Sequence, residues 1–131
     1  MPDRSDTGVV LANNAAFNGH DLEGMLANYA PDAVVVDRRP AGFGEYHGAE
    51  AIRAYYGGIL DNAVSLKEDL EIVSTADGTV VAGCHTWVEL SSDMGSGDLT
   101  VDYALLIDVR DGLIARLEVH PDADAALAAR A

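Results

Sequence analysis

The first half of the chain carries apolar residues at helical spacing in three stretches. Residues 7–17 place Val10, Leu11 and Phe17 on one face of a helix that ends before Asn18. Asp21 then fits the N-cap of a second helix, whose apolar stripe is Leu22, Met25, Leu26 and Tyr29 and which Pro31 ends. From Ala49 the third helix carries Ile52, Tyr55, Tyr56, Ile59 and Leu60 at i, i+3, i+4, i+7 and i+8.

Strand patterns occupy most of the rest of the chain. A short apolar strand covers residues 33–37, and longer ones are predicted at 64–73, 79–90, 99–109 and 113–120. Their connections are Asp77-Gly78, residues 91–98 and Asp111-Gly112, and an Asp-Gly pair favours a tight antiparallel hairpin. Helices followed by a run of hairpins predict the α+β class, with the helices packed on one face of a curved antiparallel or mixed sheet.

Composition narrows the range of partners. The 131 residues are 49% apolar and 23% charged, which predicts a single globular domain over residues 1–131. The net charge of -14, from 22 acidic and 8 basic side chains, would repel phosphate backbones and anionic lipid surfaces. We therefore expect neither nucleic acid nor a membrane as a partner.

The same composition bears on location and cofactors. Cys84 is the one cysteine and has no partner for an internal disulfide, and the N-terminal residues lack the basic and apolar regions of a secretion signal. No apolar run approaches the length of a membrane span. These features predict a cytoplasmic protein. No CxxC, HExxH, P-loop or GxGxxG motif occurs, so nothing in the sequence indicates a metal or a cofactor.

Asp37 is the first candidate catalytic residue. The strand 33–37 alternates so that Val35 and Asp37 share a face, which places a charged group on a surface otherwise built for burial. The competing interpretation is a strand-end aspartate that caps the loop through Gly42. The pattern favours a carboxylate that faces a cavity between helices and sheet.

Asp102 and Glu68 are further candidate acids. Asp102 shares a strand face with Ala104 and Leu106, and that mixed face suits either a cavity or solvent. Glu68 shares its strand face with Val64, Leu66, Leu70 and Ile72. Buried there without a partner, its carboxyl would have a raised pKa, as a general acid near neutral pH requires. The competing interpretation is a bulge or register shift that turns Glu68 outward.

His85 and Trp87 share a face of the strand 79–90. Hairpin pairing can bring either of them opposite Asp102, and a histidine against an aspartate forms an acid/base pair. The alternative is a structural histidine, with Trp87 as pocket wall or core. The residues predicted to contact a substrate are Phe17, Tyr29, Tyr55, Tyr56, Trp87 and Leu117.

Three segments resemble the NTF2-like superfamily, in particular its SnoaL-like polyketide cyclase, ketosteroid isomerase-like and polyether epoxide hydrolase-cyclase branches. They are P-D-A-V-V-V-D, H-G-A-E-A-I-R-A-Y-Y and D-G-L-I-A-R-L-E-V-H-P-D. The resemblance implies a cone, in which a strongly bent sheet surrounds a deep apolar pocket and helices close one side. It also implies a homodimer formed through the sheet.

The branches of this superfamily imply different site residues. In the isomerase-like branch the strand-end carboxylate is the base, which corresponds to Asp37, but Asn13, Asn14 and Phe17 stand where those enzymes place a tyrosine. The SnoaL-like cyclases imply His85 with Asp102, and the epoxide hydrolase-cyclases imply Asp37 with Glu68 or Asp102. The limonene epoxide hydrolase pattern needs an Asp-Arg-Asp triad, and no arginine is expected on a pocket-facing position.

Together these features predict an enzyme that uses no cofactor and closes a ring in a small hydrophobic, polyketide-like substrate. Asp37 and Asp102 are the expected proton-transferring pair, with Glu68 as the alternative partner of Asp37. Epoxide opening by water and ketosteroid-like proton transfer are the rival reactions. A non-catalytic ligand-binding or dimerisation module is the rival outside enzymes.

Overall fold

The computed structural model describes residues 5–40, 44–91 and 97–130. Its helices are α1 (Asp6–Asn18), α2 (Leu22–Leu26), α3 (Gly48–Asp61) and α4 (Ala123–Arg130). Its strands are β1 (Tyr29–Asp37), β2 (Gly44–His47), β3 (Ala63–Ala76), β4 (Thr79–Leu90), β5 (Gly97–Arg110) and β6 (Leu113–His120). None of the described helices combines the length and the apolar character needed to cross a membrane.

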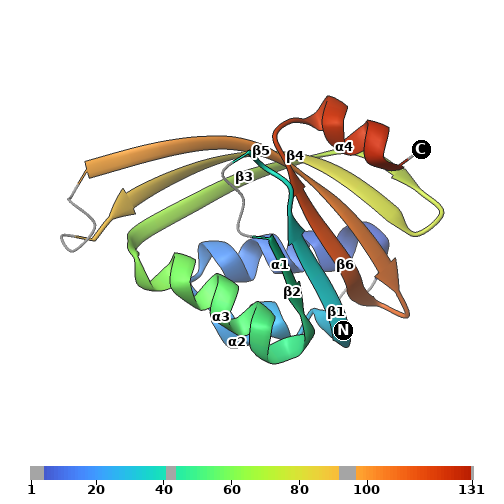
Figure 1. Ribbon diagram of the computed structural model, residues 1–131, viewed down its shortest axis with the longest axis horizontal. Coiled ribbons are helices and arrows are strands. Elements are labelled where there is room, and N and C mark those ends of the chain that lie inside the picture. The colour runs from blue at the N-terminus through green and yellow to red at the C-terminus, as the bar shows by residue number, and fades with distance from the viewer. Residues whose placement is uncertain (1–4, 41–43, 92–96, 131) are drawn as a thin grey trace.

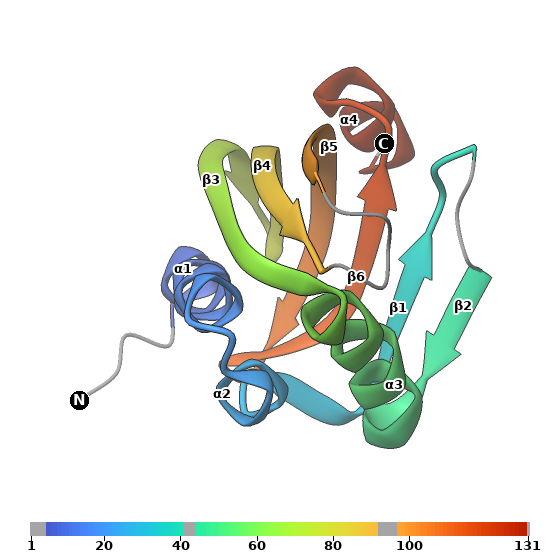
Figure 2. The same ribbon diagram turned by 90° about the vertical axis from the view of Figure 1, so that its left-hand side faces the viewer.

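The six strands form one bent sheet in the order β2-β1-β6-β5-β4-β3. Figure 1 shows α1, α2 and α3 beneath the curved strands and α4 on the opposite face, and Figure 2 shows the sheet curling over the helices. β1 pairs in parallel with β6, whereas the other pairs are antiparallel. The α+β prediction is confirmed, and the parallel β1–β6 pair makes the sheet mixed.

The ends of the first two helices follow from local chemistry. The Ser5 hydroxyl accepts a hydrogen bond from the Gly8 N–H at 3.1 Å and caps α1. The Asp21 carboxylate caps α2 by accepting from the Gly24 N–H at 2.9 Å, as predicted. The predicted extension of this helix to Tyr29 is wrong, because α2 ends at Leu26 and Tyr29 begins β1 opposite Ile114. Pairing with β6 overrides the helical spacing there.

Both predicted Asp-Gly hairpin turns are present. Asp77 and Gly78 have φ angles of 53° and 81°, and Asp111 and Gly112 have 54° and 75°. Positive φ at both central residues is the geometry of a type I′ turn, whose twist matches that of the flanking strands. A Cβ atom at Gly78 would lie 3.2 Å from the Val109 carbonyl oxygen, so this position also needs the small residue.

Two short elements, β2 and α4, were not predicted from the sequence. β2 pairs with β1 in a region interpreted as loop, and α4 follows the last strand. Ala126 of α4 packs on Val81, Ala104 and Leu106 and so covers part of the outer face of the sheet. Gly42 and most of the predicted turn 91–98 lie outside the described residues.

The main core lies between the concave face of the sheet and the helices. Ile52, Ile114 and Val35 are fully buried there. A register shift between Ala63 and Ser65 at the start of β3 leaves Val64 61% exposed, so its predicted inward position is wrong. The pairing is regular again from Ser65, which turns Leu66 and Glu68 inward.

Candidate active site

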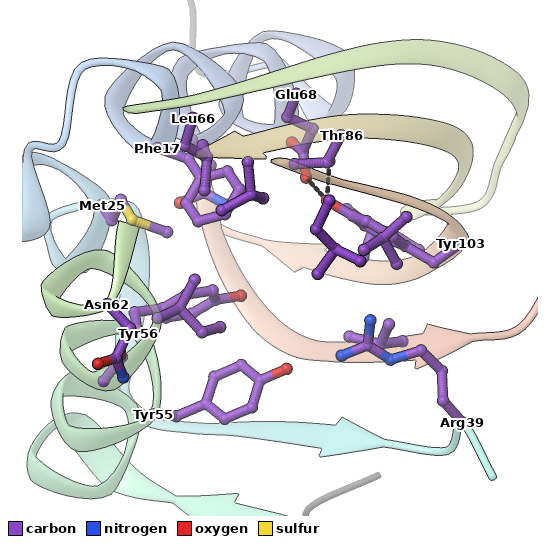
Figure 3. A pocket seen from close by; sticks show the side chains of 18 of the residues that line it. Phe17, Met25, Arg39, Tyr55, Tyr56, Asn62, Leu66, Glu68, Thr86 and Tyr103 are labelled. Carbon is purple, nitrogen blue, oxygen red and sulfur yellow. Dashed lines mark hydrogen bonds between the residues drawn. The ribbon is translucent and has the colours of Figure 1, made fainter. Parts of the chain in front are cut away.

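A cavity of about 580 Å³ opens between the helices and the concave face of the sheet. Phe17, Tyr55 and Tyr56, which were predicted to contact a substrate, line this cavity. In Figure 3, Tyr55 and Tyr56 project from α3, while Glu68, Thr86 and Tyr103 come from strands on the other side. Most of the remaining lining is apolar, and it includes Met25, Ile59, Leu66, Val88, Val101 and Leu105. Such a site suits a small hydrophobic molecule with a few polar atoms.

Asp37 is buried at the end of β1, and its side chain has no exposed surface. The prediction that it faces the cavity is wrong, because it is not among the lining residues. The Arg39 guanidinium donates two hydrogen bonds to it, Nε to Oδ1 at 2.9 Å and Nη2 to Oδ2 at 2.6 Å, and the Arg39 backbone N–H donates a third to Oδ1 at 3.1 Å. The Tyr55 hydroxyl donates to Oδ2 at 3.1 Å. Burial alone would raise the Asp37 pKa, but the hydrogen bonds from Arg39 and Tyr55 outweigh it and hold the pKa below its usual range.

Arg39 itself lines the cavity, whereas Asp37 does not. The expectation that no arginine occupies a pocket-facing position is therefore wrong. Arg39 lies two residues after Asp37 and continues the inward parity of β1 beyond the end of the strand. Its guanidinium carbon lies 5.5 Å from the centre of the Tyr103 ring. The i, i+2 spacing from Asp37 was the sequence signal that could have identified it.

Glu68 is the carboxyl group at the cavity wall, and only 7% of the residue is exposed. Its Oε2 accepts a hydrogen bond from the Tyr103 hydroxyl, and its Oε1 accepts one from Asn14 Nδ2 at 2.9 Å. The Thr86 hydroxyl lies 2.7 Å from that of Tyr103 and extends the network. Burial raises the Glu68 pKa, and the two hydrogen bonds offset this only in part. The interpretation that turned Glu68 outward is wrong.

Asp102 does not share the cavity with Asp37. Val101, Tyr103 and Leu105 of β5 face the cavity, so alternation turns Asp102 to the other side, where 78% of its side chain is exposed. Its predicted pairing with His85 is confirmed by the strand register and by a hydrogen bond from His85 Nδ1. This acid/base pair lies on the outer face, away from the cavity.

Trp87 also lies on the outer face and is 43% exposed, so its predicted place in the pocket wall is wrong. Its ring is 4.3 Å from that of His85, centre to centre. Tyr29 and Leu117 are buried in the core instead of lining the cavity. The Tyr29 hydroxyl is 2.9 Å from that of Tyr56, so it supports a lining residue from behind.

The cavity therefore places a carboxyl group, phenolic hydroxyls and a guanidinium in a largely apolar wall. Glu68 can take up a proton, and Tyr55 and Tyr103 carry phenolic hydroxyls. The Arg39 guanidinium carries five N–H donors, and its Nε and Nη2 atoms each donate one hydrogen bond to Asp37. Such donors stabilise negative charge that develops on an oxygen. Among the described residues, no three His, Cys, Asp or Glu side chains are placed to hold a metal ion.

The chain belongs to the family of SnoaL-like domains, since the model of that family matches residues 10–117. This confirms the predicted family resemblance and agrees with the cone-like arrangement of sheet and helices. Functionally curated proteins gave no match.

Several solved structures share the NTF2-like fold. TerC co-crystallized with polyporic acid is 22% identical, with a TM-score of 0.74 over 92% of this chain and 93% of that one. A proposed polyketide cyclase from Xanthomonas campestris pv. campestris is 26% identical, with a TM-score of 0.72 over 94% of both chains. A protein of ketosteroid isomerase-like fold from Catenulispora acidiphila DSM 44928, in complex with trimethylamine, is 19% identical, with a TM-score of 0.75 over 92% and 89%.

Proposed function

We propose that this protein is an acid/base enzyme that cyclises or isomerises a small hydrophobic, polyketide-like molecule. Glu68 is the proton-transferring carboxyl, and Tyr103 is its hydrogen-bonding partner. Because Asp102 lies on the outer face, Glu68 takes the place that the sequence analysis gave to Asp102. The family and its neighbours described as proposed polyketide cyclases support this class of reaction.

The observation that carries the proposal is the position of Glu68. It is a buried carboxyl group that touches an aromatic cavity, and its pKa is raised by that burial. A general base works best when its pKa lies near the working pH, and burial moves a glutamate in that direction. Asp37 has the opposite character, since its bonds with Arg39 keep it ionised.

The proposed reaction begins when the Glu68 carboxylate removes a proton from a carbon acid or a hydroxyl of the bound molecule. The electron pair left behind moves onto a substrate carbonyl oxygen or attacks the atom that closes the ring. The Arg39 guanidinium lines the cavity and can donate hydrogen bonds to the oxygen that gains charge. Protonated Glu68 then returns its proton to the product.

Deprotonation of 5-nitrobenzisoxazole, a small aromatic carbon acid, tests this role without knowledge of the natural substrate. We expect Glu68→Gln to lower kcat/KM for this probe by about 10²-fold or more, the usual contribution of one positioned base. Asp102→Asn is the matched control, because it makes the same carboxyl-to-amide change on the outer face. Equal rates for wild type and Glu68→Gln would contradict the proposal and favour a non-catalytic binding module.

Epoxide opening by water is the second candidate. It is favoured by the Asp37–Arg39 pair, because an arginine at the cavity wall was the missing part of that pattern. Turnover of an epoxide substrate in H₂¹⁸O would place the label in a diol product. Label-free cyclic product would exclude this reaction.

We also retain the proposals of a homodimer formed through the sheet and of a cytoplasmic location. Exposed Trp87 on the outer face supports the dimer, since large aromatic residues are enriched at interfaces. Sedimentation velocity measures the oligomeric state directly, and a monomer at all accessible concentrations would exclude the dimer. Cell fractionation tests the location.

A further inference from the structure

Two asparagines one turn apart on α1 contact the edge strand β3 at a single residue, Glu68. Asn18 Oδ1 accepts a hydrogen bond from the Glu68 N–H at 2.6 Å, and Asn18 Nδ2 donates to the Glu68 carbonyl at 3.1 Å. Asn14 Nδ2 donates to the same carbonyl at 3.0 Å. These amides take the place that a further strand would have at the edge of the sheet.

Only Asn14 also reaches the Glu68 carboxyl group, where its Nδ2 lies 2.9 Å from Oε1. Asn14 and Asn18 line a polar surface groove, and Glu68 is common to this groove and to the apolar cavity. The two carboxyl oxygens therefore have different surroundings. Oε1 bonds to Asn14 of the groove, and Oε2 bonds to Tyr103 of the cavity wall.

We propose that Asn14 is a positioning residue for Glu68, acting from the groove and outside the substrate cavity. By engaging Oε1, it directs Oε2 towards Tyr103 and the cavity and favours the ionised form that can accept a proton. The inference rests on the proposed role of Glu68 as the proton-transferring group. Asn14 belongs to α1 and is not one of the residues that line the cavity.

The groups around Glu68 make the hydrogen bond from Asn14 important for the charge of the Glu68 carboxyl group. Tyr103 of β5 and Cys84 of β4 are its ionisable neighbours on the sheet, and the nearby hydroxyls of Tyr29 and Tyr56 come from β1 and α3. The groove adds Asp69, Glu71 and His85. Arg39 lies against the Tyr103 ring. Neutral or acidic groups thus predominate around Glu68, and the Asn14 amide is one of its two side-chain hydrogen-bond donors.

The test compares Asn14→Leu and Asn14→Asp, both of similar shape to asparagine, with Asn18→Leu. Glu68 is titrated in the free protein by NMR of ¹³C-labelled glutamate, and Glu68→Gln assigns its signal. Asn14→Leu should raise the Glu68 titration midpoint, and Asn14→Asp should raise it further because it adds a like charge. Asn18→Leu should leave the midpoint unchanged, because Asn18 bonds only to the backbone of Glu68.

The kinetic readout is the pH profile of kcat/KM for 5-nitrobenzisoxazole. Asn14→Leu should cause a several-fold loss on the acid limb and retain the alkaline plateau, a pattern that general loss of structure would not give. Thermal melts verify that each variant is folded. An unmoved midpoint in Asn14→Leu, or an equal shift in Asn18→Leu, would overturn the inference. If the Glu68 titration midpoint shifts as expected but Glu68→Gln leaves the rate with 5-nitrobenzisoxazole unchanged, Asn14 does position Glu68. The proposed function of Glu68 is then wrong.

Discussion

Two buried carboxyl groups of the same fold differ in their environment and in what they can do. Asp37 and Glu68 are 5% and 7% exposed, so both lose nearly all their contact with water. The Arg39 guanidinium neutralises Asp37 through two hydrogen bonds, whereas the donors to the Glu68 carboxyl group among the described residues are the uncharged Tyr103 and Asn14. The pKa of Asp37 is consequently lowered and that of Glu68 is raised.

This difference shows that burial alone does not identify a proton-transferring residue. The desolvation of both groups acts in the same direction, and the charge of the partner decides the outcome. Asp37 serves as a fixed counter-ion that holds Arg39 at the cavity wall, while Glu68 is free to change its protonation state. Separate substitutions can therefore remove the Asp37–Arg39 pair and the Glu68 carboxyl group.

The largest effect is expected from Arg39→Met, which leaves the Asp37 carboxylate buried without its counter-ion. Breaking a buried ion pair from one side costs about 3–5 kcal/mol. Because 26% of the Arg39 side chain is exposed, we expect the free energy of unfolding to fall by about 2–4 kcal/mol. Urea denaturation at neutral pH measures this change.

The double variant Arg39→Met/Asp37→Asn is the control for that loss. It removes the unpaired charge as well, so it should recover part of the lost stability. If the double variant is as unstable as the sum of the two single variants, the ion pair is not the reason for the difference between Asp37 and Glu68.

A smaller effect is expected in the pH dependence of stability. The folded pKa of Glu68 lies above its ordinary value of 4.5, so its contribution is present below that value and is lost as pH rises through the folded pKa. Glu68→Gln should remove this loss of stability, which amounts to about 1.4 kcal/mol for each unit by which folding raises the pKa. Unfolding curves of wild type and variant between acidic and neutral pH test this, and a constant difference would contradict the raised pKa.

The contribution of Asp37 to the pH dependence of stability has the opposite sign. Its folded pKa lies below its ordinary value of 3.8, so it stabilises the fold above that pH and loses this contribution as pH falls through the folded pKa. The wild-type stability curve therefore contains two opposing slopes, and only the slope above pH 4.5 should disappear in Glu68→Gln.

The smallest effect is expected for Asp102→Asn on the outer face. The Asp102 and His85 side chains are 78% and 39% exposed, and an exposed pair of this kind contributes about 0–1 kcal/mol. We expect a change in the free energy of unfolding of at most about 0.5 kcal/mol, and a smaller one at high salt. A loss comparable to that of Arg39→Met would show that the outer pair matters as much as the buried one.

Much of the fold could be predicted from the sequence. The alternation of β3 to β6, the two Asp-Gly turns and the Asp21 cap are local patterns, and local physics was sufficient for each. β2 and α4 were missed because they are short and gain their stability from packing. α4 rests on Val81 and Ala104 across the sheet, which no local pattern reveals.

The site was predicted in part. The alternation in β1 and β3 placed Asp37 and Glu68 on apolar faces, and both are buried, although the sequence left open a register shift that would turn Glu68 outward. It did not decide which face of β5 meets the cavity, because Asp102 and Tyr103 are adjacent and both faces hold apolar residues. A shift of one position exchanges the two faces of a strand. Arg39 was missed because it lies beyond the strand whose parity it continues.

By itself, the sequence determined most of the helices and strands of this protein, its two Asp-Gly turns and the presence of carboxyl groups on otherwise apolar strand faces. The tertiary structure decided which carboxyl meets the cavity and which meets an arginine, and hence the direction in which each pKa moves. The reason is physical. Periodicity and turn chemistry act between residues close in the chain, whereas the electrostatic environment depends on contacts such as Glu68 with Tyr103 and Asn14, which only the folded sheet and helices bring together.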